Sequence, residues 1–400
     1  MKKLSISFLF LLVFCCTYAA EPFIVFNRTD AGFPVVDNGK PCPILVDSNE
    51  EKGILIAVET LQEDFLRVSG TKAEAVNSPS DKPCILVGSV ESPFIQQLFK
   101  SDKLNKKELE GKNEKYIIQV VEQPLEGIER ALVIAGSDMR GTIYGIYELS
   151  EQMGVSPWYW WMDVPTAKQT QVYAQTGTYT DGEPAVKYRG IFLNDEAPCL
   201  TGWVKNTYGT NYGDHRFYKQ VFELILRLKG NFLWPAMWGW AFYADDLENG
   251  KTADEMGISI GTSHHEPMAR NHQEYARNRD KYGAWNYATN PEGLNRFFRE
   301  GIERMKGTRD VVTIGMRGDG DAAMGGEEGK DHEYVPQFEK NKKLMEDIFK
   351  NQRRIIKEVT GRPAKETPQV WALYKEVLEY YDRGPVSYTH LRAHETELHL

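Results

Sequence analysis

The sequence VVTIGMRGDGD, residues 311–321, decides how the second half of the chain is organised. It begins as a short apolar run, which is typical of a parallel strand that is buried on both faces. Arg317, Asp319 and Asp321 follow directly after the run. In α/β barrels the functional residues lie at the carboxyl ends of such strands. The stretch therefore predicts a barrel strand that delivers an arginine and two carboxylates to a site.

Three other apolar runs end in polar or charged groups in the same way, namely Gly190–Glu196, Ile258–Glu266 and Pro368–Glu376. From Lys187 onward strand-like and helix-like patterns alternate, which is the signature of βαβ units. We expect strands at Tyr188–Asn194, Asn231–Trp238, Gly257–Ser263, Val311–Met316 and Gln369–Tyr374. We expect helices at Phe217–Leu228, Thr252–Met256, Pro291–Met305 and Asn341–Val359.

Residues 182–384 therefore predict part of a (β/α)8 barrel of the TIM type. A closed barrel needs eight strands and roughly 250 residues, whereas this region offers about five strand–helix units of that pattern. The connections Ala197–Asp214 and Ala322–Glu339 follow the carboxyl ends of their strands and are long and polar. This asymmetry favours that rim as the functional one.

Residues 20–181 predict a separate α/β domain. Its two amphipathic helices are expected at Glu51–Val68 and Asp138–Met153, the second with Ser137 as N-cap. We expect its strands at Pro43–Val46, Cys84–Val90, Tyr116–Val121 and Ala131–Gly136. It has no glycine-rich phosphate loop and no nucleophile elbow, so we expect it to support the barrel. The aromatic cluster Trp158–Trp161 predicts a plug between the domains.

Residues 1–19 carry the pattern of a secretory signal peptide: two lysines, an apolar run too short for a membrane span, and a small-residue cleavage site. We therefore expect a secreted or periplasmic bacterial protein without a membrane span. Removal of the signal leaves Cys42, Cys84 and Cys199. Their spacing fits neither a disulfide framework nor a zinc motif. One bridge and three packed thiols are both compatible with it, and thiols are the simpler expectation.

Residues 385–400 differ in character from the rest of the chain. They resemble translated sequencing-adapter read-through, and we expect native sequence to stop near Gly384. His390 and His394 in this tail are therefore not interpreted as a metal site.

The composition bounds the class of partner. The net charge of −9 argues against a nucleic acid, which calls for a basic surface. The nine Trp, 20 Tyr and 18 Phe first of all supply core and interfaces. A sugar-binding cleft also uses such rings, because the faces of a pyranose stack on them.

The ends of the expected strands supply the candidate binding residues. Asn194 and Asp195 either open a polar loop or hold sugar hydroxyls by paired hydrogen bonds. Trp238, beside a glycine at the rim, is the better stacking candidate of its segment. Adjacent residues of an extended chain point to opposite faces. We therefore expect one of His264 and His265 to reach the site as a hydrogen-bond donor, and no metal.

Carboxyl groups end the last two expected strands. The glycines between Arg317, Asp319 and Asp321 allow turns that would aim both aspartates at one place. The segment lacks the longer calcium-loop pattern. Glu376 follows a strongly apolar run, and a partly desolvated carboxyl suits a general acid. Two carboxyls across one cleft are the machinery of glycoside hydrolysis.

From about Tyr188 to Gly384 the sequence closely resembles glycoside hydrolase family 115, the xylan α-1,2-glucuronidases. The matching stretches are Gly190–Glu196, Asn231–Trp240, Gly261–Pro267, Gly315–Asp321 and Thr367–Tyr381. The preceding α/β domain also looks like the N-terminal domain of that family.

The resemblance implies an inverting, exo-acting enzyme that removes (4-O-methyl)-glucuronic acid from glucuronoxylan without a metal or organic cofactor. On that pattern Glu376 is the general acid and Asp321 the base that activates water. The resemblance implies that the uronic-acid pocket is lined by Asn194, Asp195, Trp238, His264, Arg317 and Tyr374.

The chain departs from the family where the later barrel strands, a helical region and a C-terminal β-rich domain would follow. Pocket residues that those parts contribute are missing with them, as is a dimer surface used by family members, and an open barrel would expose strand edges. We therefore expect this chain to be inactive although its parent is an active homodimer. Two alternatives stay open. One is a hexosaminidase-like exo-glycosidase, which would carry adjacent Asp-Glu catalysts after its fourth strand. The other is a non-catalytic carbohydrate-binding barrel, which would tolerate loss of the carboxyls.

Overall fold

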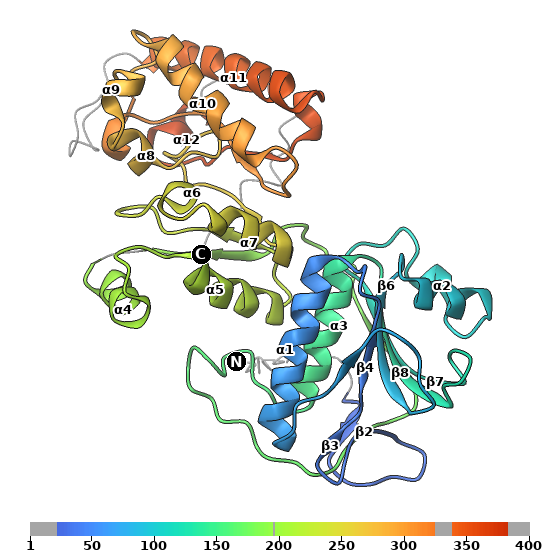
Figure 1. Cartoon of the computed structure of the whole chain (residues 1–400). Coiled ribbons are helices and arrows are strands. Elements are labelled where there is room, and N and C mark those ends of the chain that lie inside the picture. The colour runs from blue at the N-terminus through green and yellow to red at the C-terminus, as the bar shows by residue number, and fades with distance from the viewer. Residues whose placement is uncertain (1–21, 195–196, 325–337, 383–400) are drawn as a thin grey trace, which may run out of the picture.

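The computed structural model describes residues 22–194, 197–324 and 338–382 (Figure 1). Its N-terminal half is built on a six-stranded sheet in the order β10-β7-β8-β6-β4-β5. The four strands β5, β4, β6 and β8 run parallel, and β7 and β10 are antiparallel additions. The strands are β4 (Ile44–Val46), β5 (Ala75–Val76), β6 (Cys84–Ser89), β7 (Tyr116–Glu122), β8 (Arg130–Gly136) and β10 (Thr178–Asp181).

Helices cover both faces of this sheet because the strands alternate between two cores. On β6, Ile85 and Val87 join the larger core, where helices α1 (Lys52–Ser69) and α3 (Met139–Gln152) lie side by side. Leu86 faces the second core under α2 (Pro93–Lys100). This alternation follows from the two-residue period of a strand.

A small antiparallel sheet lies at the end of this half, in the order β1-β9-β2-β3. Its strands are β1 (Ile24–Val25), β2 (Phe33–Asp37), β3 (Lys40–Pro41) and β9 (Val172–Ala174). The sequence patterns did not predict this sheet, because its strands are two to five residues long. Cys42, Cys84 and Cys199 are all free thiols.

The expected cap of α3 is wrong by one residue. Asp138 is the N-cap, and its Oδ1 accepts the backbone N–H of Gly141 at 2.8 Å. The Ser137 hydroxyl instead accepts the N–H of Lys115 at 3.0 Å. The aspartate lies at the position from which a side chain reaches the third helical residue, so it satisfies the free N–H there.

The second half contains parallel strands with helices packed around them. β11 (Gly190–Phe192), β12 (Phe232–Trp234) and β13 (Ser259–Ile260) form one sheet, and β14 (Val312–Thr313) pairs with β15 (Gln369–Val370). The N–H of Val311 donates to Ile260 O at 2.9 Å, which places β14 next to β13. The five expected strands are therefore neighbours in chain order, and closure into a barrel stays a prediction.

The remaining helices belong to this half. They are α4 (Cys199–Tyr208), α5 (His215–Arg227), α6 (Phe242–Asp245), α7 (Glu248–Met256), α8 (His272–Ala276), α9 (Arg279–Tyr282), α10 (Pro291–Met305), α11 (Phe338–Thr360) and α12 (Glu376–Asp382). Short 3-10 turns lie at Lys106–Glu108, Asp319–Asp321 and Ala364–Glu366. Across the described residues no helix combines the length and the apolarity that crossing a membrane requires.

Two differences from the sequence expectations have local causes. The strand expected at Asn231–Trp238 ends at Trp234, because Pro235 has no N–H to continue the ladder. The connection expected to be irregular at Ala197–Asp214 contains α4, which buries only Val204 and so carries little helical periodicity.

A buried ion pair joins the two halves. Arg227 on α5 donates to both carboxylate oxygens of Asp64 on α1, at 2.8 and 3.0 Å, and to Glu223 at 2.9 Å. The side chains of Arg227 and Asp64 are 2% and 0% exposed. Tyr159 and Trp161 of the aromatic cluster also hydrogen-bond to α5, which confirms the cluster as an interface element. The two halves are therefore held by desolvated charges as well as by apolar contact.

We expect Arg227→Met to lower the free energy of unfolding by about 3–5 kcal/mol, because it leaves the Asp64 carboxylate buried without its partner. The double variant Arg227→Met/Asp64→Leu should recover part of that loss, since it removes the buried Asp64 charge, and Glu223 keeps its hydrogen bond from Tyr159. Urea denaturation of the two single variants and the double variant measures the coupling. Additive effects would show that the pair is not coupled.

Candidate active site

Arg317 lies at the centre of the candidate site, four residues after β14 ends at Thr313. Its side chain is fully buried. Nε and Nη2 donate to the two carboxylate oxygens of Glu376, at 3.1 and 2.7 Å. Nη1 donates to both the side chain and the carbonyl oxygen of Asp321. Burial opposes the charge, but the two carboxylates outweigh it and raise the pKa of Arg317. One guanidinium thus holds both candidate catalytic carboxyls.

The backbone presents these carboxyls from two turns. Asp321 ends the 3-10 turn Asp319–Asp321 with φ 67°, after Gly320 at φ 60°. Lys375, at φ 49°, precedes Glu376, which is the first residue of α12. Left-handed backbone is uncommon for residues other than glycine, although aspartate tolerates it better than most. The hydrogen bonds to Arg317 are in a position to hold both turns in this conformation.

The expectation that the two aspartates converge is wrong. Asp319 pairs with His272 Nε2 at 3.0 Å and makes two hydrogen bonds to Arg279. Asp321 pairs instead with Arg317 and His264. The tight 3-10 turn sends the carboxylates of its first and last residues to different neighbours. Asp321 alone therefore shares the Arg317 site with Glu376.

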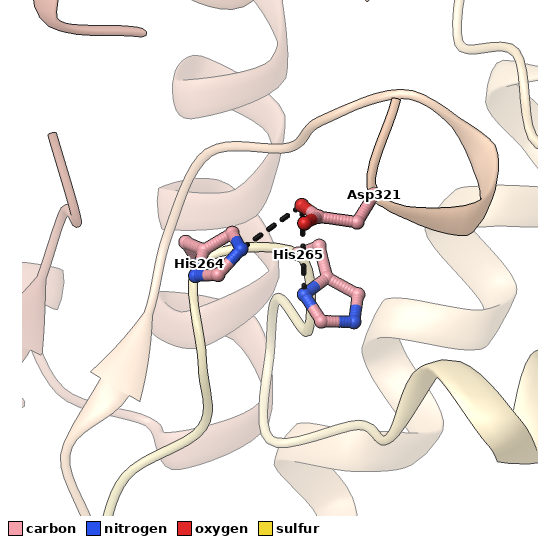
Figure 2. A group of neighbouring side chains, drawn as sticks. All are labelled: His264, His265 and Asp321. Carbon is pink, nitrogen blue, oxygen red and sulfur yellow. Dashed lines mark ion pairs between the residues drawn. The ribbon is translucent and has the colours of Figure 1, made fainter. Parts of the chain in front are cut away.

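Both histidines after β13 face Asp321 (Figure 2). His264 Nε2 lies 2.9 Å from Asp321 Oδ1, and His265 Nδ1 lies 3.8 Å from the same atom. The opposite-face rule does not apply, because residues 264 and 265 form a turn and not an extended strand. Ser263 Oγ lies 2.9 Å from His264 Nδ1, which orients the ring so that Nε2 is the nitrogen turned to Asp321.

The charge states at this point follow from burial and neighbours. Burial alone would raise the pKa of Asp321, but His264, His265 and Arg317 lower it to about 2. Burial and the adjacent His264 lower the pKa of His265 to about 3. At neutral pH the site thus presents an ionised Asp321 beside a neutral His265.

Two partly exposed aromatic rings flank the histidines. Tyr374 packs on His264 with ring centroids 4.3 Å apart, and the Arg317 guanidinium carbon lies 5.1 Å from its centroid. Trp238 stacks on His265 at 5.6 Å with 29° between the planes. The rings are 39% and 44% exposed. Both residues thus keep part of their surface open to solvent near the carboxyl pair.

The structure brings most of the sequence-predicted site residues together. Contacts through Arg317 and His264 link Glu376, Asp321 and Tyr374 into one group, and Trp238 joins it through His265. Asn194 is exposed, two residues after β11, and Asp195 lies outside the described residues.

Sequence reasoning missed three neighbours of the site. His265 was named but given no part, although it adjoins His264. Trp285 donates its indole N–H to Arg317 O at 3.0 Å, and His272 holds Asp319. The last two lie in the loop and short helices between β13 and α10, where no periodicity or motif marks them.

Glu266 lies beneath the histidines and is almost fully buried. Its Oε1 accepts the N–H of His272 at 3.0 Å, and Oε2 has no hydrogen-bond partner among the described residues. Burial raises the pKa of Glu266 to about 8. A protonated, neutral carboxyl therefore lies directly after the turn that carries His264 and His265, and it holds the start of α8 through His272.

The sequence model of glycosyl hydrolase family 115 matches residues 181–390, which is more than half of the chain and includes every residue of the Arg317 site. The chain belongs to glycosyl hydrolase family 115. In this family 115 protein, residues 39–149 also match the N-terminal domain of glycosyl hydrolase family 67. No curated protein sequence matches the chain.

A solved family 115 structure is similar over most of the chain. It is described as a 4-O-methyl-α-glucuronidase with specificity for decorated arabinogalactans, and it matches with TM-score 0.76 and 30% identity over 88% of this chain. The chitobiase of Flavobacterium johnsoniae matches with TM-score 0.50 and 15% identity over 89% of this chain, which shows a likeness of fold alone. The chain covers 44% and 52% of the lengths of these two proteins.

Glu266 gives a pH-dependent test of the site. Below pH 4.5 both the folded and the unfolded chain keep its proton; between pH 4.5 and about 8 the unfolded chain releases a proton that the folded chain keeps. The stability that Glu266 contributes is thus lost as pH rises through this window. Glutamine does not titrate in this window. We therefore expect the free energy of unfolding of Glu266→Gln to rise relative to that of the wild type by about 1 kcal/mol per pH unit.

Urea denaturation at several pH values between those limits measures the difference. Glu339→Gln, which alters an exposed carboxyl on α11, serves as the control. A constant difference between Glu266→Gln and wild type across the window would contradict the assignment of a neutral buried Glu266.

Proposed function

We propose that this chain carries the catalytic residues of an inverting, exo-acting glycoside hydrolase that removes (4-O-methyl)-glucuronic acid side chains from glucuronoxylan. The observation that carries the proposal is the Arg317 bridge, which brings Glu376 and Asp321 to one place within a family 115 chain. Two carboxyls at one site suit glycoside hydrolysis, in which one acts as acid and the other as base.

In this proposal Glu376 protonates the glycosidic oxygen as the leaving group departs. Both of its oxygens accept hydrogen bonds from Arg317. When Glu376 carries a proton, one of its oxygens gives up its hydrogen bond from Arg317. In this proposal that oxygen then donates its proton to the leaving oxygen of the substrate. Arg317 positions the acid in this step and does not itself transfer a proton.

Asp321 acts as the base toward a water molecule on the opposite face of the sugar. Its carboxylate is ionised throughout the neutral range, because its pKa lies at about 2. His264, 2.9 Å away, is placed to share the proton that Asp321 accepts from the water. Inversion follows when water attacks directly, without a covalent intermediate.

The uronic acid occupies the space beside these groups. Tyr374 and Trp238 offer partly exposed ring faces for the sugar, on either side of the histidine turn. In this proposal Asn194 and Asp195, after β11, hold its hydroxyl groups. Arg317 has no exposed side-chain area and is paired twice, so it contributes through the carboxyls that it holds.

Decorated arabinogalactan is the second candidate substrate. The similar family 115 structure is described as specific for that polymer, and it also removes 4-O-methyl-glucuronic acid. Both polymers would offer the same terminal sugar to the Arg317 site and differ in the chain that bears it. The choice between them therefore depends on surfaces beyond the carboxyl pair.

The parent enzyme, meaning a full-length family 115 protein that carries this sequence, is the form in which we propose activity. The chain covers 44% of the length of the similar glucuronidase, so pocket walls that lie in the remainder are not supplied by it. We propose that the chain alone releases no glucuronic acid, that the parent is a homodimer and that residues 1–19 direct its export.

We expect Glu376→Gln in the parent enzyme to lower the rate of glucuronic acid release by about 10²–10⁴-fold, because glutamine keeps the shape but has no proton to give. A substrate with a good leaving group, such as an aryl glucuronide, should be affected much less, since it needs no acid. Release rates with both substrates measure the effect. Glu379→Gln, an exposed change on the same helix, is the control. Equal losses with both substrates would contradict the acid role.

The two polymers can be compared directly. We expect the parent enzyme to release glucuronic acid from glucuronoxylan at least tenfold faster than from decorated arabinogalactan at equal concentrations of the uronic acid. Chromatography of the released acid measures both rates. A preference for arabinogalactan would show that glucuronoxylan is the wrong substrate, and the proposed roles of the two carboxyls would stand. The absence of release from either polymer would refute the glucuronidase proposal.

A further inference from the structure

The side chains of His264, His265 and Asp321 converge on one point, and the proposed hydrolytic mechanism gives no role to His265. One potential ligand atom from each residue lies within 4.8 Å of those of the other two. Figure 2 shows both imidazoles directed at the Asp321 carboxylate from the same turn. Two imidazole nitrogens and one carboxylate oxygen form a common set of three ligands for zinc in proteins.

His264 Nε2 lies 2.9 Å from Asp321 Oδ1 as an ion pair, and His265 Nδ1 lies 3.8 Å from the same oxygen. Neither His264 Nε2 nor His265 Nδ1 has a hydrogen-bond partner of good geometry among the described residues. His265 is only 2% exposed, so its Nδ1 is shielded from bulk solvent. Buried polar atoms are nearly always paired, and an orphaned one calls for an explanation such as a bound ion.

The spacing of the three groups suits a small cation. In a tetrahedral zinc site with bonds of about 2.1 Å, two ligand atoms lie roughly 3.4 Å apart. The distances from Asp321 Oδ1 are 2.9 Å to His264 Nε2 and 3.8 Å to His265 Nδ1. Shifts of roughly half an ångström in these two distances would bring both to the zinc value, and the two imidazole nitrogens, which lie within 4.8 Å of each other, would have to approach as well.

We propose that His264, His265 and Asp321 form a binding site for a divalent transition-metal ion of the zinc type. Neutral imidazole and an ionised carboxylate are the forms that bind metal. Ser263 Oγ contacts His264 Nδ1, so it also orients this ligand as outer partners of metal-bound histidines do.

The charge around the site accepts a dication. Arg317 is the nearest cation, and its charge is matched by the bidentate pair with Glu376. Asp319, farther along the same turn, is matched by Arg279. The carboxylate of Asp321 therefore remains as a net negative charge for the ion. Magnesium and calcium are disfavoured, because both prefer oxygen ligands and two of the three groups here are imidazoles.

Metal binding would have a consequence for the reaction that rests on the proposed function. An ion on Asp321 occupies the carboxylate that would take a proton from water. Zinc should therefore inhibit the parent enzyme, and a chelator should restore it. The metal site in this sense regulates the base and takes no part in the hydrolysis.

Zinc binding to the 400-residue chain tests the proposal without any activity assay. In every protein used, the terminal histidines are replaced by His390→Ala, His394→Ala and His399→Ala, so that they cannot contribute. Titration of the chelator-stripped chain against a chromophoric competitor measures affinity and stoichiometry. We expect one zinc ion per chain, and excess magnesium should not displace it.

Two variants test the location of the site, and a third variant is the matched control. His265→Ala and Asp321→Asn should each weaken zinc binding at least tenfold, whereas His215→Ala, an exposed histidine on α5, should not. Zinc should raise the melting temperature of the starting chain and fail to do so for the two variants, so misfolding of either is recognised from its apo melt. Stoichiometry below one, or an affinity unchanged in both variants, overturns the proposal.

Failure of zinc binding and failure of the hydrolase proposal are distinguishable. The titration needs no substrate, and the Glu376→Gln comparison needs no metal. If zinc does not bind, the three groups are left as a site for water or a sugar hydroxyl, and the metal proposal is wrong.

Discussion

A single buried cation determines how the site is built. Burying a charge costs several kcal/mol unless it is paired and hydrogen-bonded. Arg317 meets that condition only if Glu376 and Asp321, from different strand ends, come to its guanidinium together. The pairing ties the segment after β14 to the start of α12, 59 residues later in the chain. The two carboxyls that suit hydrolysis are thus the same groups that make the arginine tolerable.

The layers around this pairing differ in polarity. Tyr374 and Trp238 leave ring faces exposed, whereas Glu266 and His265 behind them are buried in neutral form. Neutral groups at depth avoid the desolvation cost of further charges. The ionised groups of the site are therefore gathered at Arg317, Glu376 and Asp321, and their neighbours are partly exposed rings and neutral buried side chains.

The sequence predicted those features of the fold that depend on neighbouring residues, such as helix caps and helical periodicity. Helix α10 has the expected bounds Pro291–Met305, because a proline begins it and Asn290 caps it. Helix α4 escaped detection because Val204 is its only fully buried residue. The motif at 311–321 indicated which residues matter, but the separate destinations of Asp319 and Asp321 depend on a 3-10 turn and on partners such as His272 and Arg279. Such partners are set by tertiary packing, which no spacing in the sequence records.

The ion pair between Arg227 and Asp64 makes each half of the chain depend on a charge in the other half. Arg227 belongs to the half that carries the carboxyl pair, and Asp64 to the half that does not. A graft of either half onto an unrelated partner would leave a desolvated charge facing apolar surface. A change at Arg227 is therefore expected to be accompanied by a change at Asp64, so that neither side of the junction keeps a buried charge without its partner.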